Sequence, residues 1–448
     1  MRLSNHLFPG DGNESVAIAL CGRQKSNLQT RLLVHEIIPI PLEECETRTP
    51  NLIKWSTANI IPHLLKASRR GLAILKIHSH PNGYPKFSNI DDRSDHEFFE
   101  SIFGWMDDNE PHCSAIMLPG GRIFGRIFNV DLTSNAISKV IVVGDDIVSW
   151  ESENSNRNEE FELRTIQAFG AGTTNRLKKM KVGIVGCSGT GSPLIEQLVR
   201  LGIGELLLID PDKIEKKNLN RIFNSTMKDA INGTYKVEVL KKAINNIGLG
   251  TIVNTHDQNI YASKAIINDI ASCDIIFGCV DSVDGRHLLN QISTFYLIPY
   301  FDVGVKLTSN GEGGINQIMG TVHYMQPGGS SLRTRGVYSD EELRAASMFR
   351  TNREAYEEQK KSGYIVDINV DSPAVISINT QLASMAVNEM LARIHLFRYD
   401  SNKEFAINRI SFTDSYYQYE KDGKPDLYLE KFVGRGDMSP VLNMPELD

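Results

Sequence analysis

Two histidines stand one residue apart in the stretch ILKIHSHPNGYPKFSNIDD, residues 74–92, and such a pair could hold a metal ion. If LAILKIHSH is a strand, His78 and His80 project from the same face and both can reach one ion. A catalytic zinc takes three protein ligands and keeps one position open for water. Asp91, beyond a loop that contains glycine and proline, could be the third ligand. We therefore predict a metal site formed by His78, His80 and Asp91.

Hydrolysis at such a metal also needs a base that takes the proton of the attacking water. Glu14, in GDGNESVAIALCG at the start of an expected strand, is our candidate general base. Glu36, in LLVHEII, is the alternative. For the HSH pattern alone, a surface loop with two histidines and a capping aspartate is the simpler interpretation.

The complete motif is more specific than the histidine pair. In chain order it comprises Glu14, His78, His80, Pro81, Ser88 and Asp91. This pattern resembles the JAB/MPN (JAMM) metalloproteases, which cut peptide or isopeptide bonds after the C-terminal glycine of ubiquitin-like proteins, and the resemblance covers roughly residues 1–135. It implies that the two histidines and the aspartate hold Zn²⁺, that the glutamate is the base, and that the serine donates a hydrogen bond to the oxyanion or the bound water.

A glycine-rich turn stands between an expected strand and an expected helix in KMKVGIVGCSGTGSPLIEQL. Gly186, Gly189 and Gly191 would let backbone N–H groups approach a phosphate, and the start of the following helix favours negative charge. Ser188 stands where a dinucleotide fingerprint has glycine, so the turn alone leaves NAD, FAD and simple tight packing open. Cys187 lies inside the turn, where we expect it to be packed.

The segments after the turn narrow the choice of ligand. Asp210 ends the next expected strand, where it can bind a ribose, and Asn218 and Arg221 follow it closely. An arginine suits a phosphate, which a dehydrogenase nicotinamide does not require. Lys236 opens an expected helix, and Asp281 stands at a strand end that suits Mg²⁺.

The motifs Gly-x-Ser-Gly-x-Gly, I-D-P-D, N-L-N-R, Y-K-V-E and V-D-S-x-x-x-R-x-x-L-N occur in this order. Together they resemble the ThiF/MoeB adenylyltransferases, the core of ubiquitin-activating enzymes. The resemblance implies bound ATP and Mg²⁺, with Asp210 on the ribose and Asp281 on the magnesium. It also implies that Asn218, Arg221 and Lys236 bind the phosphates. The implied reaction is attack by the C-terminal glycine carboxylate of a small protein on the α-phosphate, which gives an acyl-adenylate and pyrophosphate.

The same resemblance implies a homodimer. Members of the family are usually symmetric dimers in which an arginine of one subunit reaches the triphosphate of the other. Arg164 lies six residues before Gly170 in RTIQAFGAG, as in the entry segment of the family. The resemblance therefore implies that Arg164 reaches the triphosphate of the other subunit. An ordinary surface arginine is the alternative.

The sequence departs from the family where a thioester would form. Activating enzymes of that type carry a cysteine after the adenylation core, but no cysteine follows Cys279. Ser331 and Thr334 stand where many relatives place a CxxC zinc pair, so we expect no structural zinc there and no thioester from the usual loop. The acyl group then passes directly to an acceptor, or to a hydroxyl as an oxyester. The candidate hydroxyls are those of Ser330, Ser331, Thr334 and Ser347.

The chain of 448 residues is longer than one hydrophobic core usually supports. A polar stretch at 149–165 separates strand-rich runs from an alternation of strands and helices. We predict an α/β protein with a JAB/MPN-type metalloprotease domain at 1–150 and a linker at 151–162. A Rossmann-like, doubly wound adenylation domain with a mostly parallel sheet follows at 163–448, with its crossover segment at about 326–375.

Two helices are predicted late in the chain. SDEELRAASMFRTNREAYEEQKKSG begins with Ser339 and Glu342 in capping-box spacing, which predicts a charged surface helix. VISINTQLASMAVNEMLARIHLF is apolar enough for a core helix.

Composition excludes several classes of function. The net charge of −7 and the isoelectric point near 5.9 argue against a nucleic-acid partner. No run of eighteen apolar residues and no signal peptide are visible, so we expect a cytoplasmic protein without a membrane span. The six cysteines form no CxxC pair and are expected to be packed thiols.

Both resemblances point to one substrate, the C-terminal tail of a ubiquitin-like protein supplied in trans. We predict ATP-dependent adenylation of its terminal glycine, coupled to zinc-dependent maturation or deconjugation of the same modifier, in a prokaryotic conjugation pathway. A conjugating-enzyme-like protein would be one acceptor. Activation of a sulfur carrier for cofactor or cysteine biosynthesis is the alternative enzyme, and a binding scaffold with two inactive sites is the non-enzymatic alternative.

Overall fold

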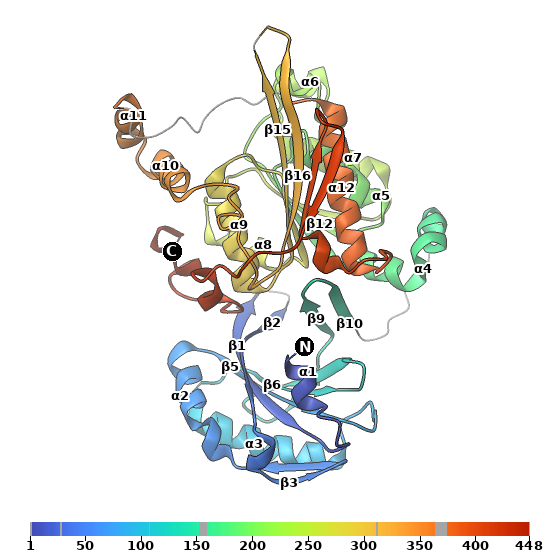
Figure 1. Ribbon diagram of the computed structural model, residues 1–448, viewed down its shortest axis with the longest axis vertical. Coiled ribbons are helices and arrows are strands. Elements are labelled where there is room, and N and C mark those ends of the chain that lie inside the picture. The colour runs from blue at the N-terminus through green and yellow to red at the C-terminus, as the bar shows by residue number, and fades with distance from the viewer. Residues whose placement is uncertain are drawn as a thin grey trace. The chain divides into compact units, whose positions relative to one another are not determined.

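The computed structural model describes residues 2–26, 29–106, 108–151, 159–310, 312–362 and 374–447. The chain forms two compact units, and Figure 1 shows their elements. Unit 1 comprises Met1–Val142, Val148–Asn154 and Phe432–Met438, and unit 2 comprises Val143–Ile147, Ser155–Lys431 and Ser439–Asp448. Parts of the predicted linker and crossover, residues 152–158 and 363–373, lie outside the described residues.

This division departs from the predicted boundaries at two short segments. Val143–Ile147, which we placed in the first domain, belongs to unit 2, and Phe432–Met438, which we placed in the second, belongs to unit 1. Both segments depend on packing between residues far apart in the sequence, for which local composition gives no signal.

Unit 1 is built on a mixed six-stranded sheet in the order β2-β1-β5-β6-β7-β8. Its strands are β1 (Val16–Lys25), β2 (Thr30–Pro39), β5 (Ala73–Ser79), β6 (His112–Met117), β7 (Ile123–Phe128) and β8 (Ser134–Ala136). Strands β5 and β6 are parallel, and the other neighbours are antiparallel. Two separate hairpins, β3–β4 (Cys45–Thr49, Leu52–Trp55) and β9–β10 (Lys139–Val143, Ile147–Glu151), complete the strands of this part of the chain.

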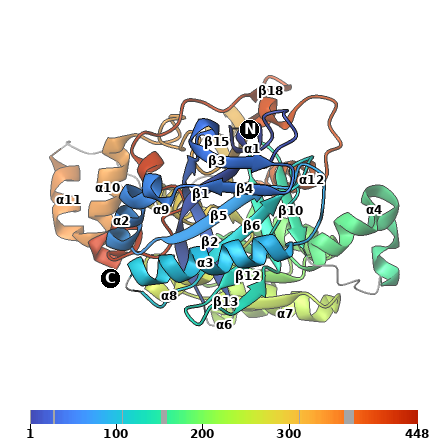
Figure 2. The ribbon, with the colours of Figure 1, turned by 90° about the horizontal axis from the view of Figure 1, so that it is seen from below.

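Helices cover both faces of this sheet because its central strands are apolar on both sides. Helices α2 (Ile61–Arg70) and α3 (Asn89–Met106) pack in one core cluster with Val16, Ile18 and Leu20 of β1. The intervening Ala17 faces a second cluster with Leu7 of the short helix α1, which spans Arg2–Leu7. Figure 2 shows α3 running across the sheet. This position of α3 brings its first turn to the end of β5.

The chain returns to unit 1 near its end. Residues Phe432–Met438 lie beside β1 beyond Cys21, the last residue of β1 that pairs with β5. The Gly22 amide donates to the Gly434 carbonyl at 3.1 Å, and the Asp437 amide donates to the Arg23 carbonyl at 2.7 Å. These bonds use backbone groups of β1 beyond the part that pairs with β5, and Arg23 and Gly436 form an isolated parallel bridge.

Unit 2 contains an eight-stranded sheet in the order β13-β12-β11-β14-β15-β16-β17-β18. The strands are β11 (Lys181–Val185), β12 (Glu205–Ile209), β13 (Ile252–His256), β14 (Ile275–Gly278), β15 (Tyr300–Ser309), β16 (Ile315–Met325), β17 (Ile407–Ser411) and β18 (Tyr416–Glu420). The first five in this order are parallel, and the last three pair antiparallel. The predicted Rossmann-like α/β arrangement is confirmed, but the sheet is mixed where we expected mostly parallel strands.

The strand order places β11 between β12 and β14, so the chain winds in opposite directions on its two sides. Ligands of such sheets bind at the carboxyl ends of the strands at this switch point. The glycine-rich turn follows β11 and therefore lies at this position.

The longer helices of unit 2 are α4 (Leu163–Lys178), α5 (Gly191–Arg200), α6 (Met227–Asn232), α7 (Lys236–Ile247), α8 (Lys264–Ala271), α9 (Val283–Tyr296), α10 (Asp340–Thr351), α11 (Arg353–Lys361) and α12 (Ile376–Ile394). The predicted capping box opens α10, since Ser339 Oγ accepts from the Glu342 amide at 3.1 Å. Helix α12 is largely buried and is the predicted core helix. In the described part of the chain, no helix has both the length and the apolar character needed to cross a bilayer.

Candidate functional site

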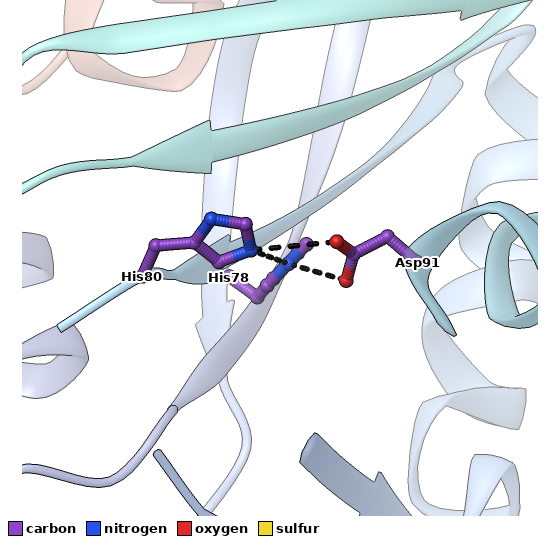
Figure 3. A group of neighbouring side chains, drawn as sticks. All are labelled: His78, His80 and Asp91. Carbon is purple, nitrogen blue, oxygen red and sulfur yellow. Dashed lines mark hydrogen bonds and ion pairs between the residues drawn. The ribbon is translucent and has the colours of Figure 1, made fainter. Parts of the chain in front are cut away.

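The predicted metal ligands come together at the carboxyl end of β5 (Figure 3). His78 is the next-to-last residue of the strand, His80 directly follows the strand, and Asp91 lies in the first turn of α3. His78 Nε2 is 3.2 Å from His80 Nε2 and 3.1 Å from Asp91 Oδ1. His80 Nε2 is 3.4 Å from Asp91 Oδ2. Across the described residues, no other group of three or more His, Cys, Asp or Glu side chains converges in this way.

These separations fit a metal ion. Ligand atoms about 2.0–2.1 Å from a tetrahedral zinc lie about 3.3 Å from one another. His80 Nδ1 lies 2.8 Å from the Tyr84 carbonyl, which can only accept, so Nδ1 carries the proton and Nε2 offers its lone pair to the cluster. His78 Nδ1 is buried without a hydrogen-bond partner, so only one of the two histidines is oriented by such a contact.

The charges of the cluster support ligand roles. Burial lowers the pKa of His78, which favours the neutral imidazole that metals bind. Burial acts to raise the pKa of Asp91, but the contacts of its carboxylate with His78 and His80 outweigh it and hold that pKa well below its usual range. A carboxylate and a neutral imidazole are both ligand forms that zinc accepts.

Glu14 lies beside this cluster. Val16 of β1 pairs with His78 of β5, which brings the residues just before β1 next to the end of β5. Glu14 Oε1 is 4.0 Å from His80 Nε2. Burial raises the pKa of Glu14 to about 7, against the opposing effect of His80. A carboxyl group with such a pKa can both take and give a proton near neutral pH.

The alternative base, Glu36, has a different environment. It is half-buried on β2 and forms an ion pair with Lys66. Ser88 lies close to the metal ligands, since its amide donates to Asp91 Oδ2 at 2.6 Å and its Oγ accepts from the Asp91 amide at 3.2 Å. These bonds fix the Asp91 carboxylate at the start of α3. The oxyanion role of Ser88 stays a prediction.

A buried ion pair that the sequence analysis missed fixes α3 against β5. Lys76, two residues before His78 on the same face of the strand, places Nζ 2.8 Å from Asp95 Oδ1. Asp95 is fully buried one helical turn after Asp91, and Arg126 of β7 binds its other oxygen at 2.7 Å. The pair therefore supports the two elements that carry the predicted metal ligands.

Lys76→Met is expected to lower the free energy of unfolding by about 3 kcal/mol, because it leaves the buried Asp95 carboxylate with one cation in place of two. Urea denaturation followed by tryptophan fluorescence measures this change. Lys66→Met is the matched control, since its partner Glu36 is one-third exposed and such pairs are worth about 0–1 kcal/mol. Equal losses in the two variants would contradict a special role for the Lys76–Asp95 pair.

The second predicted set lines a cavity of about 450 Å³ at the carboxyl ends of β11, β12 and β14. The predicted residues on its wall are Gly186, Asp210, Asn218, Arg221, Lys236 and Asp281. Residues that the sequence analysis did not single out also line it, among them Asp212, Lys213, Asn259, Tyr261, Ser282 and Asp284. Gly189 and Gly191 are not on the wall, but they shape the turn behind it.

The glycine turn is too tight for side chains. Gly186 has a φ of +92°, which disfavours other residues, and a Cβ on Gly191 would lie 1.9 Å from the Gly186 carbonyl oxygen. A Cβ on Gly189 would lie 2.3 Å from Asn379 Nδ2. Asn379, on the buried face of α12, is thus a neighbour of the turn that only the tertiary structure reveals.

Gly191→Ala is expected to destabilise the protein by about 1–3 kcal/mol, because the added methyl group collides with backbone that has no room to move. Thermal or urea denaturation measures the loss. Gly172→Ala is the matched control, since its Cβ would meet nothing within 4 Å and alanine favours the helix that contains it. Unchanged stability of Gly191→Ala would contradict the close approach of the Gly186 carbonyl oxygen to position 191.

Charged groups of the cavity are held in defined positions. Asp210 Oδ2 accepts from the Cys187 amide at 2.7 Å, and its Oδ1 is 3.4 Å from Lys236 Nζ. Burial raises the pKa of Asp210, and Lys236 opposes this. Asn218 Oδ1 accepts from the Glu215 amide at 2.9 Å, which leaves its amide nitrogen for a ligand. The Cys187 thiol is fully buried, as expected for a packed cysteine.

Three predicted residues differ in how they reach the cavity. Arg221, whose Nη1 donates to the Lys217 carbonyl at 2.8 Å, and the exposed Asp281 both line it. Arg164 is exposed on α4, donates to Gln167 at 3.0 Å and is not on the cavity wall of its own chain. Its role in the site of a second subunit stays a prediction.

Hydroxyls and ion pairs occupy the place where a zinc pair was considered. Ser331 Oγ donates to Asp426 Oδ2 at 2.6 Å, and the Ser331 amide donates to Thr334 Oγ1 at 2.8 Å. Arg333 pairs with the same aspartate at 3.2 Å. A parallel set joins Ser330 and Arg335 to Asp422.

This network limits the choice of acyl acceptor. Ser330 and Ser331 are buried and already donate their hydroxyl protons, so they are poor acceptors. Thr334 also donates its hydroxyl proton, to the Ser331 carbonyl at 3.0 Å, but it is exposed. Ser347 lies half-buried in a shallow groove of α10 and α11. Of the four predicted hydroxyls, these two remain accessible.

Comparison with known proteins assigns the second part of the chain. Residues 162–422, more than half of the 448, match the family model described as "ThiF family". The chain belongs to the ThiF family. This confirms the predicted ThiF/MoeB resemblance, whereas residues before 162 lie outside the match and their assignment rests on their own geometry.

Curated relatives of this ThiF-family chain are named ubiquitin-like modifier-activating enzyme 5. The protein of Culex quinquefasciatus is 28% identical over 194 residues, which cover 41% of this chain and 46% of that protein. The protein of Drosophila grimshawi is 30% identical over 164 residues, which cover 34% and 38%. The chain thus spans less than half the length of these relatives. Among solved structures, E. coli MccB with ATP is 18% identical with a TM-score of 0.45, over 60% of this chain and 74% of that chain.

Proposed function

We propose that this protein uses ATP to adenylate the C-terminal glycine of a ubiquitin-like protein supplied in trans. The observation that carries the proposal is the cavity at the switch point of the sheet, whose wall brings together Asp210, Lys236 and Asp281 with the glycine turn. Membership of the ThiF family and the name of the curated relatives agree with this reaction and substrate class.

The residues that line the cavity fit a nucleoside triphosphate such as ATP. The turn after β11 offers backbone N–H groups, and the N-terminus of α5 adds a partial positive charge for phosphate. Lys236, Arg221 and the amide of Asn218 would bind the phosphates, and Asp210 would accept hydrogen bonds from the ribose. Asp281 would hold Mg²⁺, which when bound supplies further positive charge to the phosphates.

In the proposed reaction, the glycine carboxylate of the modifier attacks the α-phosphorus. A new P–O bond forms, the bond to the bridging oxygen breaks, and pyrophosphate leaves with the electron pair. Lys236 and Arg221 neutralise the charge that grows on the leaving group. The product is the acyl-adenylate of the modifier.

We further propose that unit 1 is a JAB/MPN-type zinc peptidase acting on the same C-terminal tail. His78, His80 and Asp91 would hold the zinc, which when bound polarises the attacking water. Glu14 would take the proton of that water and return it to the leaving amine, and Ser88 would donate to the oxyanion. The 4.0 Å separation of Glu14 from His80 and its pKa near 7 support this role.

Adenylation and cleavage would then form one pathway of modifier maturation, activation or removal, which we place in a prokaryotic cytoplasm. Without a crossover cysteine, the acyl group would pass directly to a conjugating-enzyme-like acceptor or to Thr334 or Ser347 as an oxyester. A homodimer would let Arg164 reach the triphosphate of the other subunit.

Intact-protein mass spectrometry tests the adenylation. The purified chain is mixed with Mg·ATP and a ubiquitin-like protein encoded in the same genome, with and without thiol or hydroxide treatment. A modifier–AMP species without an adduct on this chain indicates direct transfer, and a thiol-resistant, base-labile adduct indicates an oxyester. If neither species forms, the proposal is contradicted and the sulfur-carrier or scaffold alternative is favoured.

A further inference from the structure

We propose that Asp212 is a specificity and positioning residue of the nucleotide site, whose carboxylate holds Lys236 as an exchangeable counter-ion that the phosphates of ATP displace. The inference rests on the proposed adenylation function. It assigns a role to a cavity residue that the motif comparison left without one.

The contact between the two side chains is direct. Lys236 Nζ lies 2.6 Å from Asp212 Oδ2 and 3.4 Å from Asp210 Oδ1. All three residues line the same cavity. Lys236 therefore faces the ligand volume with two carboxylates competing for one ammonium group.

The two carboxylates differ in how firmly they are held. Asp210 is 6% exposed and also accepts hydrogen bonds from the amides of Cys187 and Asp212. The Asp212 side chain is 65% exposed. Water can therefore solvate the Asp212 carboxylate when it loses Lys236, whereas release of the Asp210 carboxylate would leave a buried charge unpaired. Asp212 is consequently the partner that a phosphate can replace at low cost.

Lys236 has the opposite character. Its side chain is only 6% exposed, so water offers the ammonium little compensation. Burial acts to lower the pKa of Lys236, but the two carboxylates outweigh it and raise that pKa. The ammonium keeps its charge by exchanging one anionic partner for another, and a phosphate oxygen is such a partner.

Backbone bonds hold Lys236 in place independently of the Asp212 carboxylate. The Lys236 amide donates to the Asp212 carbonyl at 3.0 Å, and the Ile214 amide donates to the Thr234 carbonyl at 2.8 Å. Between these bonds, Lys213 and Tyr235 form an antiparallel bridge. Because these backbone bonds join the segment 212–214 to the segment 234–236, Asp212→Asn removes the carboxylate charge and leaves Lys236 in its position.

The effect of Asp212 on affinity therefore depends on whether the ligand carries phosphates that contact Lys236. The Asp212 charge opposes occupation of Lys236 by any anion, but it has no effect on a ligand that does not touch Lys236. Asp212 would thus weaken binding of triphosphate, favour release of pyrophosphate and leave the contribution of the nucleoside unchanged.

Isothermal titration of the full chain with ATP and with adenosine, both with Mg²⁺, tests this inference. Asp212→Asn is expected to bind ATP about two- to fivefold more tightly, the range that loss of a competing exposed ion pair supports. Adenosine affinity stays unchanged, and the gain for ATP shrinks at high salt.

Two further variants make the result specific. Asp257→Asn, an exposed residue outside the cavity wall, makes the same change in net charge and is expected to leave ATP affinity unchanged. In a Lys236→Met background, Asp212→Asn is expected to give no gain, since the counter-ion then has no cation to hold.

The outcomes separate this inference from the proposed function. If the wild-type chain binds ATP more tightly than adenosine, the proposed nucleotide site stands. Weaker or unchanged ATP binding by Asp212→Asn, or equal shifts for ATP and adenosine, then overturns the role of Asp212 alone. A gain that persists with Lys236→Met also overturns it, because the carboxylate would act on phosphate directly. No binding of either ligand by the wild-type chain would remove the proposed function and this inference together.

Discussion

Glu14→Gln is expected to lower the rate of cleavage after the tail of a ubiquitin-like protein by about 10²- to 10⁴-fold, the usual contribution of a general base. Glutamine preserves the shape of the side chain but cannot accept the proton of the attacking water. The metal ligands are untouched, so bound zinc should stay stoichiometric. Hydrolysis of a modifier fusion followed by gel or fluorescence, with metal analysis of the same sample, measures both quantities.

Two variants bracket this result. Glu36→Gln changes the other carboxyl group considered from the sequence and is expected to keep full peptidase activity, because Glu36 is paired with Lys66 on β2. His80→Ala removes a ligand and is expected to lose both zinc and activity. Loss of activity in Glu36→Gln but not in Glu14→Gln would reverse the assignment of the base. Adenylation should be unaffected in all three variants.

The convergence of the three candidate metal ligands was predictable because their spacing is local. Alternation along one strand places His78 and His80 on the same face, and Asp91 follows within one short loop and the first turn of a helix. The candidate base lies far from these residues in the sequence. Only the pairing of Val16 with His78 shows why Glu14 and not Glu36 lies at the cluster. The Lys76–Asp95 pair was missed for the same reason, although a lysine on the inner face of an apolar strand was a visible signal.

The cavity proposed to bind ATP shows the same limit. Its predicted members belong to motifs that follow strand ends, so the parallel strand order carries them all to one edge of the sheet. Asn379 and Tyr261 come from elements whose position depends on tertiary packing, and no local pattern marked them. Asp212 stood inside the I-D-P-D motif, where a second carboxylate was a visible signal of a possible partner for Lys236.

The pairing of late segments with distant strands could not be predicted from the sequence. Strands β16 to β18 are antiparallel and follow the parallel part, where the sequence analysis expected mostly parallel strands. The exposed β18, with tyrosines on both faces, has no buried side to give it a clear alternation. The segment Phe432–Met438 pairs with a strand some 400 residues earlier, which composition cannot show.

Asp281→Asn is expected to lower ATP–pyrophosphate exchange in the presence of the modifier by about 10²- to 10³-fold, the loss typical when one stabilising group of a transition state is removed. Among the described residues, no hydrogen bond or salt bridge engages the Asp281 carboxylate, which is exposed on the cavity wall and free to hold Mg²⁺. An amide is a much weaker ligand for this hard cation. Peptidase activity, which depends on the other metal cluster, should be retained.

Asp284→Asn is the control that decides whether the effect belongs to Asp281 or to acidity in general. Asp284 lines the same cavity, but its carboxylate already accepts from the Gly285 amide at 2.9 Å and pairs with Arg350 at 3.4 Å. Because these contacts occupy its oxygens, Asp284 is a poorer magnesium ligand, and we expect exchange to fall less than about tenfold. Raising the Mg²⁺ concentration should rescue part of the loss in Asp281→Asn and none in Asp284→Asn. A larger loss and a Mg²⁺ rescue in Asp284→Asn would instead assign the magnesium to Asp284, and the triphosphate would then have a different orientation in the cavity.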